Sequence, residues 1–400
     1  MTVRLLTSAL GFSDAEYAVM AHSLENWTGP EFIDDDADTR SALPVPDGDI
    51  IGREDDVDLL STMLLSGQRL VTITGFPGSG KTRLAIEVAR AVQSAAGTRV
   101  IWVGGGGGQG SEAVPDLAAS ARSAPHGQRD ALLRALSGKE TALLVVDDAH
   151  WGSWPIGIPR PPHPSFQVLI TSRRPLRLPG EIVHLALPLG GPAGTDESAG
   201  ACPAAQLLTQ YIRRFQPGFR NADSSSTAVA ELCRSLDGNP ALLLGIAEAF
   251  SMFDPESIVR YVTADIASAV AEAAPTVLAG AWDMVDTLES ETKELLLKIS
   301  GMDSDWSVDD LAELLGEPPL RVGRRVRGLL EAGLIQPCTT LGAPRFQVLR
   351  LVRAMMRMSG RDRPQKPSLL DLGSAFRSQD TDLQDTDLQD TDLQDTDLKR

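Results

Sequence analysis

The segment GFPGSGKT, Gly75 to Thr82, lies between two runs of contrasting pattern. Before it comes LVTIT (residues 70–74), an apolar, β-branched run typical of a buried strand. After it, apolar residues from Leu84 to Val92 recur at helical spacing. A strand, a glycine-rich turn and a helix in this order are what a phosphate-binding loop requires. An accidental glycine turn is the alternative, and the flanking pattern disfavours it. We therefore predict that this segment binds a purine nucleoside triphosphate.

Each position of the loop has a physical role in that prediction. Glycines permit tight turns, so that successive backbone N–H groups point at one anion, and the N-terminus of the following helix adds its positive dipole end. Lys81 supplies a mobile charge for the β- and γ-phosphates, and the Thr82 hydroxyl can ligate Mg²⁺. The predicted nucleotide contacts within the loop are Gly75, Gly78, Ser79, Gly80, Lys81, Thr82 and Arg83.

A metal site also needs a carboxylate at the end of a nearby strand, and the run LLVVDD (residues 143–148) supplies one. We expect Asp147 to hold the Mg²⁺ shell, directly or through water, and Asp148 to polarise the attacking water. A strand that ends in a solvated turn is the alternative, because Asp is common in turns. The phosphate-binding loop favours the functional interpretation.

The next strand candidate ends in LITSRR (residues 169–174). An arginine beside the phosphates can sense the γ-phosphate through charge-assisted hydrogen bonds. Arg173 is a better candidate for this role than Arg174, and an ordinary surface arginine pair is the alternative. The predicted catalytic residues are Lys81, Asp147, Asp148 and Arg173.

From residue 50 onward the pattern alternates between strand and helix, and it then becomes mostly helical. All-apolar strands such as residues 142–146 indicate a parallel sheet covered on both faces. We predict an α/β fold: a P-loop parallel sheet covered by helices, followed by a helical subdomain and a winged-helix subdomain. Strand candidates are residues 70–74, 99–103, 142–146, 166–171 and 182–187. Helix candidates are residues 203–215, 223–236, 240–252, 255–272 and 275–300, and residues 305–358 suggest two helices, a hairpin over 335–349 and a final helix.

Five regions follow from these patterns. They are an N-terminal helix with an acidic linker, a nucleotide-binding domain, a helical lid, a winged-helix-like subdomain and a disordered acidic tail of Asp-Thr-Asp-Leu-Gln repeats. Their bounds are residues 1–47, 48–190, 202–288, 289–360 and 361–400. The run Gly104 to Gly108 is better interpreted as a loop than as a dinucleotide-binding motif, because no conforming helix follows it. The tail lacks the glycine and the terminal glutamate of a calcium-binding loop.

The chain carries a net charge of −17, which argues against broad coating of nucleic acid. Ten arginines between residues 319 and 363 leave a local basic patch possible. The three cysteines, Cys202, Cys233 and Cys338, form no metal-binding or disulfide pattern. The sequence shows neither a signal-peptide pattern nor an apolar run of membrane-spanning length, so we expect a cytoplasmic protein that does not contact the membrane.

Several motifs occur in one order along the chain: IIGRE (50–54), the phosphate-binding loop, Asp147-Asp148, TSRRPL (171–176) and LDGNPALLL (236–244). That order resembles the NB-ARC/STAND class of signal-transduction ATPases. More narrowly, residues 172–181, 232–248 and 346–355 resemble the ATPase core of SARP-type and large LuxR-like bacterial regulators. The similarity covers about residues 48–358.

This resemblance implies roles for further residues. The segment that contains Ile51 and Arg53 would wrap the adenine, and the turn that contains Pro240 would belong to a helical subdomain that closes over the base. Arg173 would act as the first sensor. Residues 290–358 would form the winged-helix subdomain, which in relatives clamps the ADP-bound resting state.

The chain departs from the class in two places. Leu349-Arg350 stands where NB-ARC proteins often have a His-Asp pair, and an apolar Leu349 cannot hydrogen-bond the β-phosphate of ADP. Asp148 is one methylene shorter than the glutamate of vigorous ATPases, which favours slow turnover or a stably bound nucleotide.

Together these features predict an ATP/ADP-driven conformational switch with slow, Mg²⁺-dependent hydrolysis, which regulates through self-association or a protein effector. The runner-up is a DNA-binding transcriptional regulator that uses the basic winged helix. Arg321, Arg324, Arg325 and Arg327 follow a helical spacing that suits this role, unless they pair with acidic groups instead. A small-molecule kinase is a third option, which the upstream IIGRE motif and the helical second half disfavour.

Overall fold

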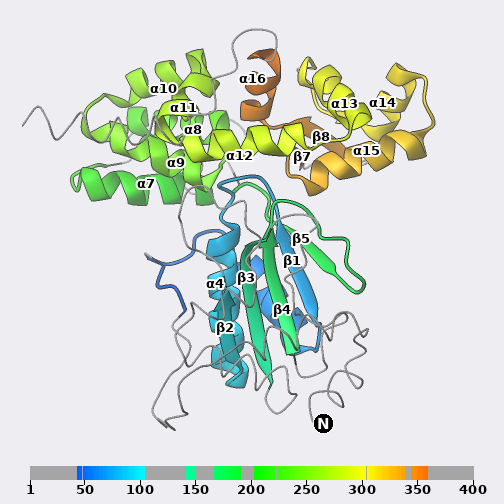
Figure 1. The fold of residues 1–400 in the computed structure, drawn as a ribbon. Coiled ribbons are helices and arrows are strands. Elements are labelled where there is room, and N and C mark those ends of the chain that lie inside the picture. The colour runs from blue at the N-terminus through cyan, green and yellow to red at the C-terminus, as the bar shows by residue number, and fades with distance from the viewer. Residues whose placement is uncertain are drawn as a thin grey trace, which may run out of the picture.

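The computed structural model describes residues 43–46, 48–103, 141–149, 166–190, 202–220, 223–302, 304–338 and 344–358. The predicted N-terminal helix, the glycine run at 104–108 and the repeat tail lie outside these ranges. Figure 1 shows two lobes stacked on one another, with a sheet in one and a group of helices in the other. The carboxyl ends of the strands face the helical lobe, which is the edge where parallel α/β sheets place their ligands.

The sheet has five parallel strands, which confirms the predicted α/β class. The strand order is β2-β3-β4-β1-β5, so the strand before the phosphate-binding loop lies between β4 and β5. The strands are β1 (Leu70–Thr74), β2 (Arg99–Val103), β3 (Ala142–Ala149), β4 (Phe166–Ser172) and β5 (Ile182–Leu185). All five begin where the sequence predicted. β3 runs three residues further than the predicted end at residue 146, and β5 ends two residues before the predicted end at residue 187.

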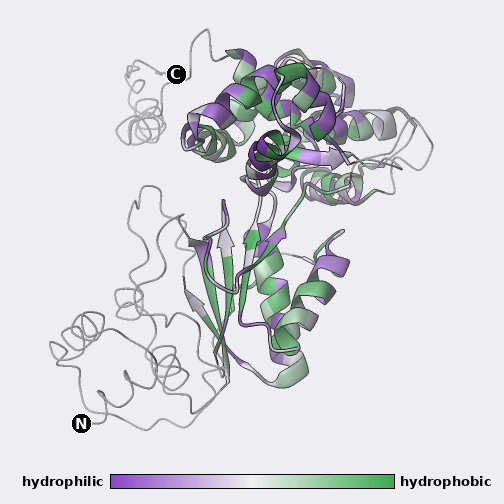
Figure 2. Ribbon diagram, turned by 90° about the vertical axis from the view of Figure 1, so that its right-hand side faces the viewer, coloured by the Kyte–Doolittle hydropathy of each residue, from purple (hydrophilic) through white to green (hydrophobic). Residues whose placement is uncertain are grey.

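Alternating side chains build two apolar layers on the sheet. Leu143 and Val145 of β3 pack on the face that carries α3 (Glu54–Leu65) and α4 (Lys81–Ala96). Leu144 and Val146 point to the opposite face, as the two-residue period of a strand requires. Figure 2 shows hydrophobic colour along much of the strands and helices of mixed colour on one side of the sheet.

The second lobe begins with α7 (Pro203–Phe215), which has the predicted bounds. Two of the predicted helices, residues 255–272 and 275–300, are wrong as single elements. Asp265 ends the first half of one and caps the second half, because its carboxylate accepts a hydrogen bond from the Ser268 amide at 3.1 Å. The further helices of this part are α8 (Asp223–Ser235), α9 (Pro240–Ala247), the 3₁₀ turn η2 (Glu248–Ser251), α10 (Pro255–Ala264), α11 (Ile266–Ala273) and α12 (Pro275–Asp286).

The last part of the described chain joins three helices to a small sheet and ends in a fourth. The predicted hairpin over 335–349 is confirmed, and a strand of two residues that the sequence did not reveal pairs antiparallel with it. Two residues are too few to show a period. The elements are α13 (Ser290–Ser300), β6 (Trp306–Ser307), α14 (Val308–Leu315), α15 (Pro319–Glu331), β7 (Ile335–Cys338), β8 (Arg345–Val348) and α16 (Arg350–Met358).

One continuous apolar cluster runs through the whole helical lobe, from α7 to α16. It also takes in one side chain from the phosphate-binding loop: Phe76, which is 2% exposed. The loop is therefore attached to the core of the opposite lobe as well as to its own strand.

Candidate nucleotide-binding site

The loop from Gly75 to Thr82 leads directly from β1 into α4, whose first residue is Lys81. Gly78 has a positive φ of 78°, and a Cβ there would lie 2.7 Å from both the Ala241 Cβ and the Asn239 Oδ1. Only glycine fits this close approach to the start of α9. The loop is thus held between the sheet and the helical lobe.

Lys81 points back over the loop that precedes it. Its Nζ donates hydrogen bonds to the carbonyl oxygens of Gly75 and Phe76, at 3.1 and 3.0 Å. The pKa of Lys81 is lowered to about 8, chiefly by burial and in part by the charge of Arg173, while the nearby charges of Asp148 and Asp147 oppose this shift. A phosphate bound in the loop would give the buried Lys81 ammonium a partner of opposite charge.

Thr82 and Asp147, the two predicted metal ligands, are in direct contact. The Thr82 hydroxyl donates to Asp147 Oδ1 at 2.8 Å, and the Asp147 side chain is buried. A second hydroxyl, that of Thr171 on β4, donates to the same oxygen at 2.6 Å. The sequence analysis gave Thr171 no role.

This pair fits Mg²⁺ in one specific way. Mg²⁺ prefers oxygen ligands and is usually held by one or two carboxylates together with phosphate oxygens and water. Within the residues that the structure describes, no group of three His, Cys, Asp or Glu side chains could hold a metal by itself. Thr82 and Asp147 therefore suit an ion that arrives with a nucleotide rather than a permanent metal centre.

Arg173 and Arg174 both point from the end of β4 toward α12, but they make different contacts. Arg174 donates to the carbonyl oxygens of Met284 and Thr287, at 2.6 and 3.1 Å, which ties it to the C-terminus of the helix. Arg173 lies 3.6 Å from Asp283 in a partly exposed ion pair, close enough to Lys81 to affect its pKa. Of the two, Arg173 is the side chain near the phosphate end of the site.

A pocket of about 510 Å³ opens beside the loop, within the size range of small-molecule sites. Its phosphate end is formed by the loop and α4, and its other end by side chains from α7, α9 and the segment before α3. Its lining includes Ile51, Arg53, Gly78, Ser79, Gly80, Lys81, Thr82, Arg83 and Pro240 from the predicted site, and Ile50, Leu207, Gln210, Tyr211 and Leu244 besides. Four residues of the predicted site are absent from the lining: Gly75, Asp147, Asp148 and Arg173. The Gly75 carbonyl accepts the hydrogen bond from Lys81, and Asp147 reaches the pocket only through its contact with Thr82.

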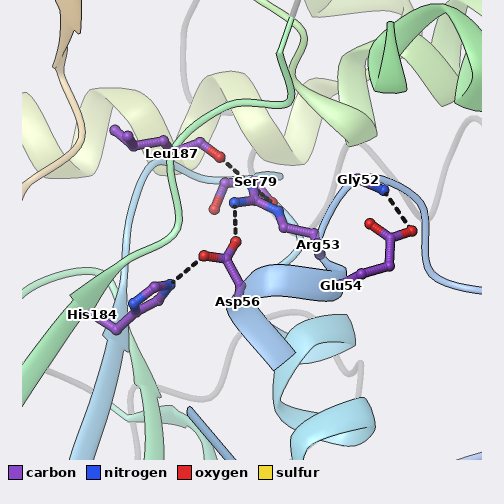
Figure 3. A network of polar contacts seen from close by, with 7 residues as sticks. All are labelled: Gly52, Arg53, Glu54, Asp56, Ser79, His184 and Leu187. Atoms are coloured by element: carbon purple, nitrogen blue, oxygen red, sulfur yellow. Dashed lines mark hydrogen bonds and ion pairs between the residues drawn. The ribbon is translucent and has the colours of Figure 1, made fainter. Parts of the chain in front are cut away.

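Arg53 lines the pocket, but its guanidinium is directed to protein acceptors (Figure 3). It donates to Asp56 at 3.0 Å, to the Ser79 carbonyl of the loop at 3.2 Å and to the Leu187 carbonyl beyond β5. Asp56 lies in turn 3.1 Å from Nε2 of His184 on β5. This fork of hydrogen bonds braces the loop against the edge of the sheet, a use that favours Arg over Lys.

Arg83 and Asn239 also connect segments around the pocket. Arg83 donates to the Gly48 carbonyl at 2.6 Å and pairs with Glu87 at 2.9 Å, which fixes the chain before α3 against α4. Asn239 caps α9, where Pro240 is the first residue, and its Nδ2 donates to the Pro77 carbonyl at 2.9 Å. Asn239 thus joins the helical lobe to the loop.

The part of the chain after α12 reaches the loop as well. Gly333 follows α15, and a Cβ there would lie 2.5 Å from the Phe76 backbone nitrogen. Glu331 pairs with Arg177 of the sheet lobe at 2.5 Å. Asp237, before α9, accepts a hydrogen bond from the Arg350 amide at 2.5 Å. The three parts of the described chain meet around one loop, which spacing in the sequence could not reveal.

Comparison with known proteins gives limited similarity. No family model matches the sequence. Three curated proteins named as candidate HTH-type transcriptional regulators, one from Mycobacterium bovis and two from strains of Mycobacterium tuberculosis, are each 28% identical over 319 residues. The match covers 72% of this chain and 33% of theirs, so the chain spans about one third of the length of these relatives.

A solved structure is similar over more of the chain but at lower identity. It is a Signal Transduction ATPase with Numerous Domains (STAND) protein with a tetratricopeptide repeat sensor from Pyrococcus horikoshii. The identity is 16%, the TM-score 0.31, and the match covers 83% of this chain and 46% of that one. Separately, none of the helices in the described part of this chain is both long and apolar enough to cross a membrane.

Proposed function

We propose that this chain binds ATP and ADP with Mg²⁺ and acts as a nucleotide-dependent conformational switch in regulation, as a signal-transduction ATPase of the NB-ARC/STAND type. The observation that carries the proposal is the contact between Thr82 and Asp147 at 2.8 Å, beneath a loop with the full phosphate-binding sequence. A hydroxyl at the start of the helix and a carboxylate at the end of a nearby strand of the same sheet are the protein ligands that Mg²⁺-nucleotide sites use.

The organisation we propose follows the expected boundaries: a nucleotide-binding domain to residue 190, a helical lid over 202–288 and a winged-helix subdomain over 289–360. The order helix, strand, helix, helix, strand, strand from α13 to β8 supports the last assignment. In this arrangement Pro240 and Ile51 would flank the base, and the brace made by Arg53 would hold the loop in shape.

The free energy available from γ-phosphate contacts is large enough to support a conformational switch. Driving an equilibrium from mostly closed to mostly open needs about 5.5 kcal/mol of differential binding. Charge-assisted contacts to a γ-phosphate contribute about 1.5–3 kcal/mol each, so two or three of them are of that order. Lys81, Arg173 and a Mg²⁺ ion on Thr82 and Asp147 would supply these contacts.

The described conformation resembles a resting state in one respect. Arg173 is paired with Asp283 of the lid, so an arriving γ-phosphate would compete with Asp283 for its guanidinium. That exchange would loosen the lid when ATP replaces ADP. Asp148, exposed at the end of β3, would polarise water, and its short side chain is consistent with slow hydrolysis.

The test is nucleotide content of the purified protein together with its size in ADP and in a non-hydrolysable ATP analogue. We expect bound adenine nucleotide in the wild type, its loss in Lys81→Ala, and a nucleotide-dependent change in mass or shape as the protein self-associates or opens. Wild-type protein that binds neither nucleotide contradicts the proposal.

A DNA-binding regulator is the second candidate, and the names of the mycobacterial relatives favour it. The contacts of the arginines in α15 do not favour a DNA-binding role. Arg321 and Arg325 pair with Glu317 and Arg327 pairs with Glu331, so much of the basic charge is compensated within the subdomain. A salt-dependent decrease in the electrophoretic mobility of generic duplex DNA on adding the protein would favour this candidate. The absence of any shift at low salt would exclude it for this segment.

A further inference from the structure

The end of β3 contains an irregularity that places both acidic residues of the site. Val146 pairs with Ile170 of β4, and Ala149 pairs with Ser172. Two residues of β3, Asp147 and Asp148, therefore stand opposite one residue of β4, Thr171. This is a β-bulge, a feature that bends a strand and redirects a side chain.

The bulge explains why the Asp148 carboxylate is not buried against the apolar face of the sheet. In a regular strand Asp148 would follow Leu144 and Val146 onto the same apolar face. Instead Ala149 joins that face and is 3% exposed, while Asp148 is the extra residue and is exposed. Its φ of 55° is in the left-handed region, which an aspartate adopts at some cost.

Thr171 makes the hydrogen bonds that fit this geometry. Its side chain is 1% exposed, and its hydroxyl donates to Asp147 Oδ1 at 2.6 Å. The Thr171 hydroxyl oxygen in turn accepts a hydrogen bond from the Asp148 amide at 2.8 Å. A hydroxyl has one proton and two lone pairs, so one group satisfies both neighbours at once. The Ser172 hydroxyl donates to the Ala149 carbonyl at 2.8 Å and closes the bulge on its far side.

We infer that Thr171 is a positioning residue for the nucleotide site: it orients Asp147 toward the Mg²⁺ position and holds Asp148 in the turn that keeps its carboxylate off the apolar face of the sheet. The inference rests on the proposed nucleotide-binding function. When Mg²⁺ takes up the Thr82 hydroxyl, Thr171 remains the partner that fixes the Asp147 carboxylate.

The experiment compares affinity for a non-hydrolysable ATP analogue in Mg²⁺ and in EDTA. Thr171→Val keeps the shape of the side chain and removes both hydrogen bonds, whereas Thr171→Ser keeps them. We expect Thr171→Val to lose about tenfold or more of the Mg²⁺-dependent gain in affinity, as partners of metal ligands commonly do. Affinity in EDTA should be unchanged, and Thr171→Ser should retain the gain.

Thr72→Val is the matched control. Thr72 is a buried threonine on the neighbouring strand β1, and its hydroxyl has no hydrogen-bond partner among the described residues. Its substitution should leave the Mg²⁺-dependent gain intact. If Thr171→Val does not fold, Thr171→Ala is measured in its place, and Thr171→Ser still decides.

The outcomes separate the two proposals. An undiminished Mg²⁺-dependent gain in Thr171→Val, or an equal loss in Thr171→Ser, overturns the role of Thr171 while nucleotide binding stands. Equal wild-type affinity in Mg²⁺ and EDTA overturns it as well. Wild-type protein that binds no nucleotide in either condition overturns the proposed function itself.

Discussion

Gly333 lies directly against Phe76, so close that a Cβ on the glycine would be 2.5 Å from the phenylalanine's backbone nitrogen. The turn after α15 and the phosphate-binding loop are 257 residues apart in number (333 minus 76), yet their backbones touch. Any movement of the loop on nucleotide binding therefore presses on the last part of the described chain.

The first prediction concerns a substitution that forces Gly333 and the loop apart. Gly333→Ala introduces a Cβ that meets backbone atoms and cannot be accommodated by rotating a side chain. Overpacking of this kind typically costs about 1–3 kcal/mol, so we expect release of ADP to accelerate by about tenfold. Release of a fluorescent ADP analogue, followed by stopped flow, measures it.

Gly316→Ala is the control for backbone strain. Gly316 has nearly the same φ, +65° against +67°, and no atom lies within 4 Å of the position its Cβ would take. It should lose some thermal stability, as Gly333→Ala does, without faster release. Equal release rates in both variants would show that the contact with the loop does not restrain the nucleotide.

The second prediction concerns the pair of Arg173 and Asp283. Asp283→Ala frees the guanidinium for a γ-phosphate, so the ratio of affinities for the ATP analogue and ADP should rise about three- to tenfold. Stability should change little, because partly exposed ion pairs contribute about 0–1 kcal/mol. Asp286→Ala, which removes a pair with Lys293 near the end of the same helix, should leave the ratio unchanged. A ratio that rises equally in both variants contradicts the exchange.

The third prediction is a pH dependence of nucleotide affinity. The pKa of Lys81 is about 8 in the free protein, and phosphate must raise it by favouring the ammonium. Above pH 8 the free protein has to take up a proton when it binds, so affinity should fall by up to about tenfold per pH unit. Titration calorimetry in buffers of different ionisation enthalpy would detect the proton. Lys81→Arg, which stays charged, should flatten the dependence even if it binds more weakly.

The fourth prediction is a pH dependence of folding stability through Asp237. Burial raises the pKa of this carboxyl to about 7, although the hydrogen bond from the Arg350 amide and the charges of Arg350 and Arg353 oppose the shift. An unfolded aspartate titrates near pH 3.9, so the folded state retains the proton over the range between about pH 4 and 7. The stability that Asp237 contributes is then complete below about pH 4 and declines as pH rises through 7.

Asp237→Asn removes this titration and keeps an oxygen that can accept from Arg350. The difference in unfolding free energy between wild type and variant should therefore move in favour of the variant as pH rises from 5 to 7. Denaturant titrations at several pH values measure it. Asp58→Asn, at an exposed position of α3, should show no such trend. A constant difference for Asp237→Asn would contradict the raised pKa.

The elements that the sequence predicted best are those with local signals. The strand before Gly75 and the helix from Lys81 have one consistent period each. The contact between Thr82 and Asp147 follows because β1 leads into α4 at the same edge of the sheet where β3 ends, with β4 between the two strands. The break at Asp265 was missed because the apolar spacing continues across it. A local helix cap decided the outcome there.

Other features depend on partners that are distant in the chain. The bulge at Asp148 needs Thr171 on another strand, and the strand predicted from the sequence ended at residue 146, before both aspartates. Arg53 was expected at the base, yet its guanidinium binds carbonyls at residues 79 and 187. Only the assembled sheet brings those acceptors together, so no local pattern could have indicated them.

Phe76 gives the phosphate-binding loop a second anchor, because its ring is packed in the apolar cluster of the helical lobe. Separating the lobes would expose that ring to water, at a cost of about 1.5–3 kcal/mol. A single benzyl group thereby sets a threshold for opening. A ligand whose binding contributes less free energy than this can occupy the pocket without separating the two lobes.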